Sequence, residues 1–128
     1  MTAPTLSSAL AVPFLFTSLG AGSDISVAFA AGPSPVGVTV PTNYYWMQLA
    51  PSSNEFLRVV AAAINSAMAS AGRADVFTVT MGADSRVTIS NANPFTMTLG
   101  IPLLLMGFTT QPINVTSVTA TNPPQHFA

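Results

Sequence analysis

Few side chains in this 128-residue chain could transfer a proton, attack a substrate or bind a metal ion. The sequence contains one histidine, four carboxylates and no cysteine, and these residue types supply most acid–base, nucleophilic and metal chemistry. His126 lies close to the C-terminal end, where a catalytic base is poorly constrained. The carboxylates lack the close spacing of recognised metal motifs: Asp24, Glu55, Asp75 and Asp84. We therefore expect that the protein is not an enzyme and has no catalytic residue, no bound metal ion and no cofactor.

The charged residues have simpler structural interpretations. Asp84 lies in "GADS", which is typical of the turn of a hairpin. Arg73 and Asp75 are separated by one residue, and we expect a solvated connector at this point. Glu55 and Arg58 are three residues apart, the spacing of a side-chain pair on the outer face of a helix.

Binding of nucleic acid requires a basic patch that displaces counterions from phosphates. The chain has no lysine, and its three arginines are scattered: Arg58, Arg73 and Arg86. No glycine-rich loop lies between a strand and a helix, where a phosphate would be held. We therefore expect no nucleic-acid partner and no small-molecule substrate.

The scarcity of charge is the most unusual property of the composition. Charged residues make up 5% of the chain, against about 25% in typical soluble domains. Because a free monomer relies on surface charge for solubility, a formal net charge of -1 predicts that neighbouring subunits cover much of the surface. The alternative is a monomer that its many Ser, Thr and Asn residues keep soluble.

A membrane protein could also carry little charge, but the apolar runs are too short for a spanning helix. Such a helix needs about 20 mainly apolar residues. The longest candidates, "ALAVPFLF" at 9–16 and "LGIPLLLMGF" at 99–108, are shorter and contain proline. We expect no membrane partner.

The length predicts one domain with one core, and we expect it at residues 36–108. Residues 1–35 contain several prolines and glycines between apolar stretches, which predicts an extended arm with one or two short strands. Residues 109–128 predict a second extended arm with a possible edge strand at 113–119. Apolar and aromatic residues of the two arms are candidates for contacts with neighbouring subunits: Phe14, Leu15, Phe16, Val27, Phe29, Ile113, Val115, His126 and Phe127.

The first half of the expected core combines a strand with a helix. Valines alternate in "VGVTVP" at 36–41, the pattern of a strand. The adjacent aromatics Tyr44, Tyr45 and Trp46 would point to both faces of a strand, so they are further interface candidates, with core filling the expected role of the tryptophan.

A helix is expected at about 53–71. Ser52 and Glu55 have the spacing of a capping box, and Gly72 is placed to end the helix. Apolar residues recur at steps of three and four and would share one face: Phe56, Val60, Ala63, Ile64, Ala67, Met68 and Ala71.

The second half of the core predicts a three-stranded meander. Apolar and polar residues alternate in "DVFTVTM" at 75–81, "RVTIS" at 86–90 and "FTMTLG" at 95–100. "PLLLMGF" then predicts one helical turn that begins at Pro102 and stops at Gly107. The expected fold class is therefore α+β: one amphipathic helix packed on a small antiparallel sheet, with extended N- and C-terminal arms.

The order of these elements resembles a module of virion structural proteins of tailed bacteriophages. The resemblance rests on the helix "SSNEFLRVVAAAIN", the strands "FTVTMGADSRVTISNANPFTMTL" and the ending "LLLMGF", where the family has "LGF". It covers residues 36–108 and implies a protein of the virion whose partners are copies of itself and other virion proteins.

The function that this resemblance implies is a multi-copy structural component of the phage tail or baseplate, with arms that clasp neighbouring subunits. Two alternatives remain: a capsid decoration protein on the head surface, or a receptor- or carbohydrate-binding module at a fibre tip. In the second of these, Tyr44, Tyr45 and Trp46 would form an exposed platform.

Overall fold

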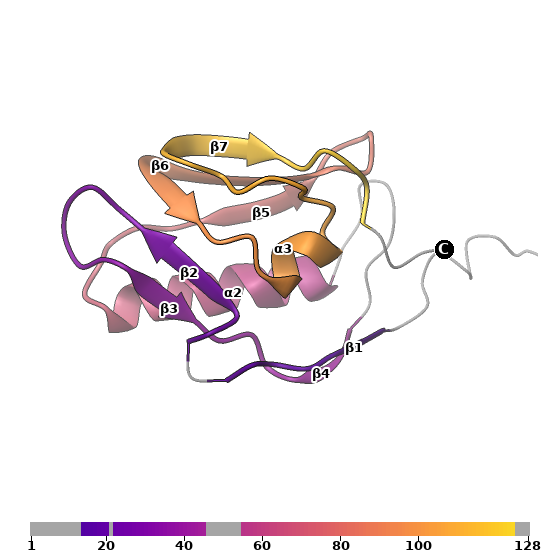
Figure 1. Ribbon diagram of the computed structural model, residues 1–128, viewed down its shortest axis with the longest axis horizontal. Helices are drawn as coiled ribbons and strands as arrows, with labels where there is room; N and C mark the ends of the chain where they lie inside the picture. Colours follow the sequence, from indigo (N-terminus) through magenta and orange to yellow (C-terminus); the bar gives the residue numbers. More distant parts are fainter. Residues whose placement is uncertain (1–13, 21, 46–54, 125–128) are drawn as a thin grey trace, which may run out of the picture.

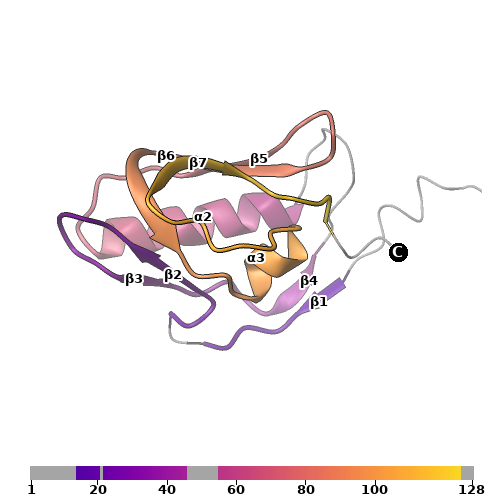
Figure 2. The ribbon, with the colours of Figure 1, turned by 45° about the horizontal axis from the view of Figure 1, so that its top comes forward.

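The computed structural model describes residues 14–20, 22–45 and 55–124. The fold is α+β, as predicted, with one main helix, a short second helix and antiparallel sheets. Figures 1 and 2 both place the main helix, α2, between upper strands β5, β6 and β7 and lower strands β1 to β4. Ser52, Trp46, His126 and Phe127 lie outside the described residues.

The strands form two antiparallel sheets. The smaller sheet pairs β1 with β4, and the larger one joins β3, β2, β6 and β5 in that order, with β7 also paired to β6. The bounds of the strands are β1 Phe14–Phe16, β2 Ile25–Ala28, β3 Val36–Val38, β4 Asn43–Tyr45, β5 Thr78–Met81, β6 Val87–Met97 and β7 Val115–Thr119.

The helix α2 spans Glu55–Ser70 and has the predicted buried face. Its fully buried residues Phe56, Val60, Ile64 and Met68 are four apart, so they form one row along the helix. Gly72 ends the helix as predicted, because it adopts a φ of +81° and the N–H of the next residue, Arg73, donates to the Met68 carbonyl at 2.9 Å.

The predicted three-stranded meander is wrong in one respect: the runs at 86–90 and 95–100 belong largely to one strand, β6. The sequence "NANP" between them has the composition of a turn, but β6 continues through Pro94. On one side β6 pairs with β5 up to Ser90 and with β2 only from Thr96, so no ladder bond needs the N–H that proline lacks. The third strand beside β5 and β6 is β7.

The core extends beyond residues 36–108. Strand β2, from the predicted N-terminal arm, pairs with β6, and its residues Ile25 and Val27 are fully buried. The C-terminal strand predicted at 113–119 is present as β7, but it pairs with β6 and is followed by the buried Ala120. The described parts of both predicted arms therefore belong to the same hydrophobic core as the helix.

The short helix α3 spans Ile101–Leu105 and confirms the predicted final turn. Gly107 stops it with a φ of +101°, and the N–H of Phe108 donates to the Leu103 carbonyl at 3.0 Å. This geometry returns the Phe108 ring to the core, where it is buried.

Candidate functional site

The structure divides the predicted interface residues into three groups. Leu15, Tyr44 and Ile113 are exposed, and Phe29 and Val115 are partly buried. Phe16, Val27 and Tyr45 are buried in the core, so their assignment to an interface is wrong for this conformation. Phe14 lies in β1, opposite Tyr45. The three buried residues were misassigned because they belong to strands that complete the core of their own chain.

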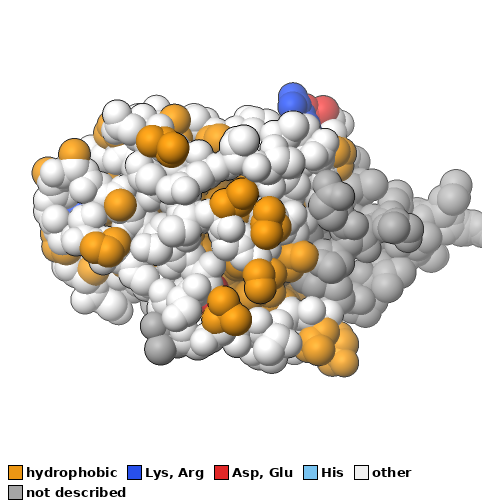
Figure 3. Space-filling view, in the orientation of Figure 1, with side chains coloured by type: hydrophobic (Ala, Val, Ile, Leu, Met, Phe, Trp, Pro, Cys, Tyr) orange, Lys and Arg blue, Asp and Glu red, His pale blue; other side chains and the backbone are white. Residues whose placement is uncertain are grey.

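Exposed apolar side chains gather over α3 and the β1–β4 ribbon. Leu15 and Tyr44 lie directly opposite each other and are 53% and 64% exposed. Ile101 and Leu104 are exposed on one side of α3. Leu19 is connected to this region through Asp24, which accepts a hydrogen bond from the Leu19 N–H and whose carbonyl oxygen lies beside Gly100. We call Leu15, Leu19, Tyr44, Ile101 and Leu104 the apolar patch; hydrophobic side chains over these elements are visible in Figure 3.

The surface carries even less charge than the composition indicates. Three of the seven charged side chains are buried or nearly so: Asp24, Arg73 and Asp75. The remaining four lie on the hairpin between β5 and β6 or on the first turn of α2: Asp84, Arg86, Glu55 and Arg58. In Figure 3 almost the whole visible face is free of charge apart from one pair at its top.

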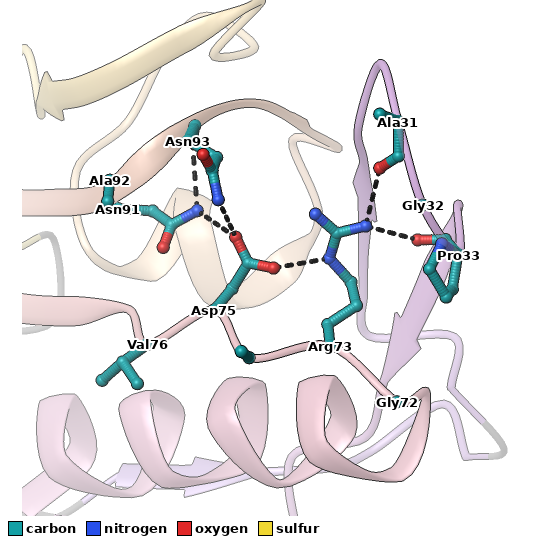
Figure 4. Close-up of a pocket in the computed structure, with 11 residues that line it drawn as sticks. Ala31, Gly32, Pro33, Gly72, Arg73, Asp75, Val76, Asn91, Ala92 and Asn93 are labelled. Atoms are coloured by element: carbon teal, nitrogen blue, oxygen red, sulfur yellow. Dashed lines mark hydrogen bonds and ion pairs between the residues drawn. The ribbon is translucent and has the colours of Figure 1, made fainter.

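A buried polar cluster joins the end of α2 to two strands (Figure 4). The Arg73 Nε donates to Asp75 Oδ1 at 2.6 Å, and the side chains are only 9% and 3% exposed. The other carboxylate oxygen of Asp75 accepts hydrogen bonds from the amide groups of Asn91 and Asn93 at 2.9 and 3.1 Å. The prediction of a solvated connector at Arg73 and Asp75 is therefore wrong.

The same arginine also holds the hairpin between β2 and β3. Its Nη1 donates to the carbonyl oxygens of Ala31 and Pro33 at 2.8 and 3.0 Å, and its Cζ lies 3.5 Å from the centre of the Phe29 ring. A Cβ at position 32 would come within 2.6 Å of Nη1, so Gly32 allows this close approach. The cluster lines a shallow hollow of about 570 Å³.

The electrostatics of the cluster favour an ionised carboxylate. Burial alone raises the pKa of Asp75, but the hydrogen bonds from Asn91, Asn93 and Arg73, together with the arginine charge, outweigh burial and lower this pKa from 3.8 to about 2. A carboxylate held ionised and occupied on both oxygens is unsuited to accept a proton near neutral pH. The geometry therefore assigns the cluster to joining α2, β6 and the β2–β3 hairpin.

A second buried carboxylate, Asp24, joins the β1–β2 connection to the segment after β3. It accepts hydrogen bonds from the Ser18 hydroxyl at 2.6 Å, from the Leu19 N–H at 2.8 Å and from the Val40 N–H at 2.8 Å. With an exposed fraction of 2% and three donors, Asp24 satisfies the Val40 N–H, which would otherwise be buried without a partner.

Strands β5, β6 and β7, which we call the upper sheet, carry hydroxyl groups in place of charges on their solvent-facing side. The strand registers align two rows across β5, β6 and β7: Thr78, Ser90 and Ser117, and Thr80, Thr88 and Thr119. Hydroxyls bond within these rows, at 2.6 Å between Thr78 and Ser90 and at 2.9 Å between Thr88 and Thr119. The hydroxyl groups of this face can form hydrogen bonds with water, whereas the Leu and Ile side chains of the apolar patch cannot.

Two features of these sites were missed from the sequence. Asn91 and Asn93 have the composition of a turn, and Arg73 reaches backbone carbonyls about forty residues earlier in the chain. The signal available for the asparagines was their spacing: residues 91 and 93 are two apart, so in a continuous strand their side chains lie on the same face. The contact of Arg73 with Ala31 and Pro33 has no local sequence signal.

Among the described residues, no group of three or more His, Cys, Asp or Glu side chains is placed to hold a metal ion. Neither of the two described helices is both long and apolar enough to cross a bilayer. Comparisons of the chain with protein families, with curated proteins and with solved structures found no match.

Proposed function

We propose that this protein is a structural component of a bacteriophage virion, built in many copies into the tail or baseplate. Its function is assembly, through contacts with copies of itself and with other virion proteins. One observation carries the proposal: an apolar patch lies on a surface from which nearly all charge is absent.

Physical chemistry connects this surface to assembly. Burial of exposed apolar groups such as Leu104 and Tyr44 against a neighbour lowers the free energy by about 25 cal/mol for each Å² of apolar surface removed from water. Charged side chains oppose such burial, because they must be desolvated, and none of the patch residues is charged. A subunit that is covered on several sides by neighbours needs little surface charge of its own.

The resemblance of residues 36–108 to virion proteins supplies the biological setting of the proposal. The apolar patch supports assembly in general, and the virion, the tail and the baseplate follow from the resemblance alone. A head-surface decoration protein would satisfy the same physical requirements.

Light scattering across a range of concentrations tests the assembly function. The full chain has a mass of 13.2 kDa, and we expect a defined multiple of this mass, or growth into rings or tubes, at moderate salt. A soluble monomer at every concentration would contradict the proposal.

Exposure of Tyr44 supports a second candidate function, a carbohydrate-binding module. Its ring is 64% exposed on the β1–β4 ribbon, and exposed aromatic rings can stack against sugar rings. If Tyr44 remains accessible in the assembled protein, titration with host-surface glycans should change its fluorescence. Burial of this ring on assembly would favour the structural function.

A further inference from the structure

The outer edge of β7 differs from the other long edge of the upper sheet. Beside β5, Asn65 of α2 bonds to Phe77, the residue directly before the strand. Its Oδ1 accepts from the Phe77 N–H at 2.7 Å, and its Nδ2 donates to the Phe77 carbonyl at 3.1 Å. These two bonds imitate a neighbouring strand. Beyond β7, no described residue makes a backbone ladder, because β7 pairs only with β6.

The hydrogen-bond alternation identifies the unpaired groups of β7. The Ala120 N–H donates to the Val87 carbonyl at 2.8 Å. In an antiparallel pair the residues that bond to the partner alternate with residues whose backbone groups point away. Val118 therefore faces β6 like Ala120, and the N–H and C=O groups of Ser117 and Thr119 point outward. Val115 lies beyond the register shift and is paired with Phe95 of β6.

Strand β7 also lacks the features that protect exposed edges. Natural edge strands carry lysine or other charges, proline or a bulge. The sequence of β7 is Val-Thr-Ser-Val-Thr, which contains none of these residues and has high β propensity. The register shift in this region lies between the Ser90–Ser117 and Phe95–Val115 pairs, where five steps along β6 face two steps along β7.

We propose that β7 is a self-association edge, at which two copies of the chain pair their β7 strands antiparallel about a two-fold axis at Val118. This inference rests on the proposed assembly function and assigns its first contact. Ser117 of one copy lies opposite Thr119 of the other, so each of these outward-facing residues meets another outward-facing residue. No like charges oppose each other, since neither strand carries a charge.

The product is a continuous sheet in the order β5, β6, β7, β7, β6, β5. Its outer surface continues the hydroxyl row of Thr78, Ser90 and Ser117 into the second copy, with small side chains at the junction. The pairing is isologous and closes at two copies, so it leaves the apolar patch free to extend the assembly.

A proline substitution tests this edge with a matched control at the same position. Ser117→Pro removes an N–H that makes no bond to β6, whereas Ser117→Ala keeps that N–H and removes only the hydroxyl. We expect light scattering on the full chain to show that Ser117→Pro halves the mass of the assembly while Ser117→Ala leaves it unchanged. A folded Ser117→Pro protein with the wild-type mass would overturn the inference.

Amide hydrogen exchange of the wild-type chain gives a test that needs no substitution. Hydrogen exchange of the Ser117 and Thr119 amides should become at least tenfold slower as concentration rises through the association range, while exchange of the outward amide of Val79 on β5 should not change. If the mass rises and these β7 amides stay unprotected, β7 pairing is excluded and the assembly function stands. A wild-type monomer at all concentrations would exclude both.

Discussion

At the scale of single residues, buried charge joins segments that are distant in sequence. Asp24 and the Arg73–Asp75 pair are enclosed, and hydrogen bonds occupy both oxygens of each carboxylate. A buried ion pair is weak evidence for stability, because desolvation offsets much of the attraction. Loss of one partner is costly, since it leaves a charge without compensation. We therefore interpret these residues as fixing where the helix end, the β2–β3 hairpin and β6 meet.

Asp75 predicts an acid-dependent loss of stability. The pKa of Asp75 is lowered in the folded chain from 3.8 to about 2. The ionised carboxylate therefore stabilises the fold at pH values above the pKa that Asp75 has in the unfolded chain. As pH falls from about 4.5 to about 2, protonation should remove roughly 2 kcal/mol of unfolding free energy. Urea denaturation at a series of pH values measures this loss.

Two variants separate Asp75 from the other carboxylates. Asp75→Asn should be less stable than the wild type by about 3 kcal/mol at pH 6, because Arg73 stays buried without its partner, and its further loss in acid should be smaller. Asp84→Asn is the matched control, since the Asp84–Arg86 pair lies at the surface and the side chains are 54% and 43% exposed. Equal acid sensitivity in the wild type and Asp75→Asn would contradict the role of this carboxylate.

At the scale of elements, local sequence signals predicted more than the contacts between elements. The four-residue spacing of Phe56, Val60, Ile64 and Met68 identified the buried face of α2, and glycines 72 and 107 marked the ends of both helices. Alternating residues identified β3, β5 and parts of β6, and β7 was expected only as a possible edge strand at 113–119. The continuity of β6 was missed because local composition cannot show that its partners change from β5 to β2 at the asparagines.

The two glycines that end α2 and α3 predict different costs of substitution. Both adopt a positive φ, +81° at Gly72 and +101° at Gly107, so alanine is strained at each. At Gly72 no atom lies within 4 Å of an added Cβ, whereas at Gly107 the Cβ would overlap the carbonyl oxygen of Asn122.

We therefore expect Gly72→Ala to lower the unfolding free energy by about 1 kcal/mol, and Gly107→Ala by about 3 kcal/mol or more. Chemical denaturation of the two variants makes this comparison directly. Equal losses would show that the segment after β7 is not held against α3 as closely as the structure places it.

At the scale of the whole molecule, the sequence indicated correctly that charge is scarce but could not show how the remainder is distributed. Three of the seven charged side chains are buried or nearly so. The surface over β5, β6 and β7 is therefore polar through its hydroxyl groups, and the surface over α3 and the β1–β4 ribbon is apolar. The exposure of the candidate interface residues was predicted in part: Leu15, Tyr44 and Ile113 are exposed, while Phe16, Val27 and Tyr45 complete the core. Exposure depends on tertiary packing, which a local pattern of apolar residues does not determine.

The apolar patch predicts that assembly can be weakened without loss of the fold. The double substitution Ile101→Ser and Leu104→Ser removes exposed apolar groups from α3, so it should cost little stability in the monomer. We expect at least a tenfold rise in the concentration needed for association beyond a dimer, measured by light scattering or sedimentation. Val76→Ser is the control, because Val76 is 68% exposed but lies beside the Arg73–Asp75 cluster. If the control weakened assembly as much as the double variant, association would depend on general surface hydrophobicity and not on this patch.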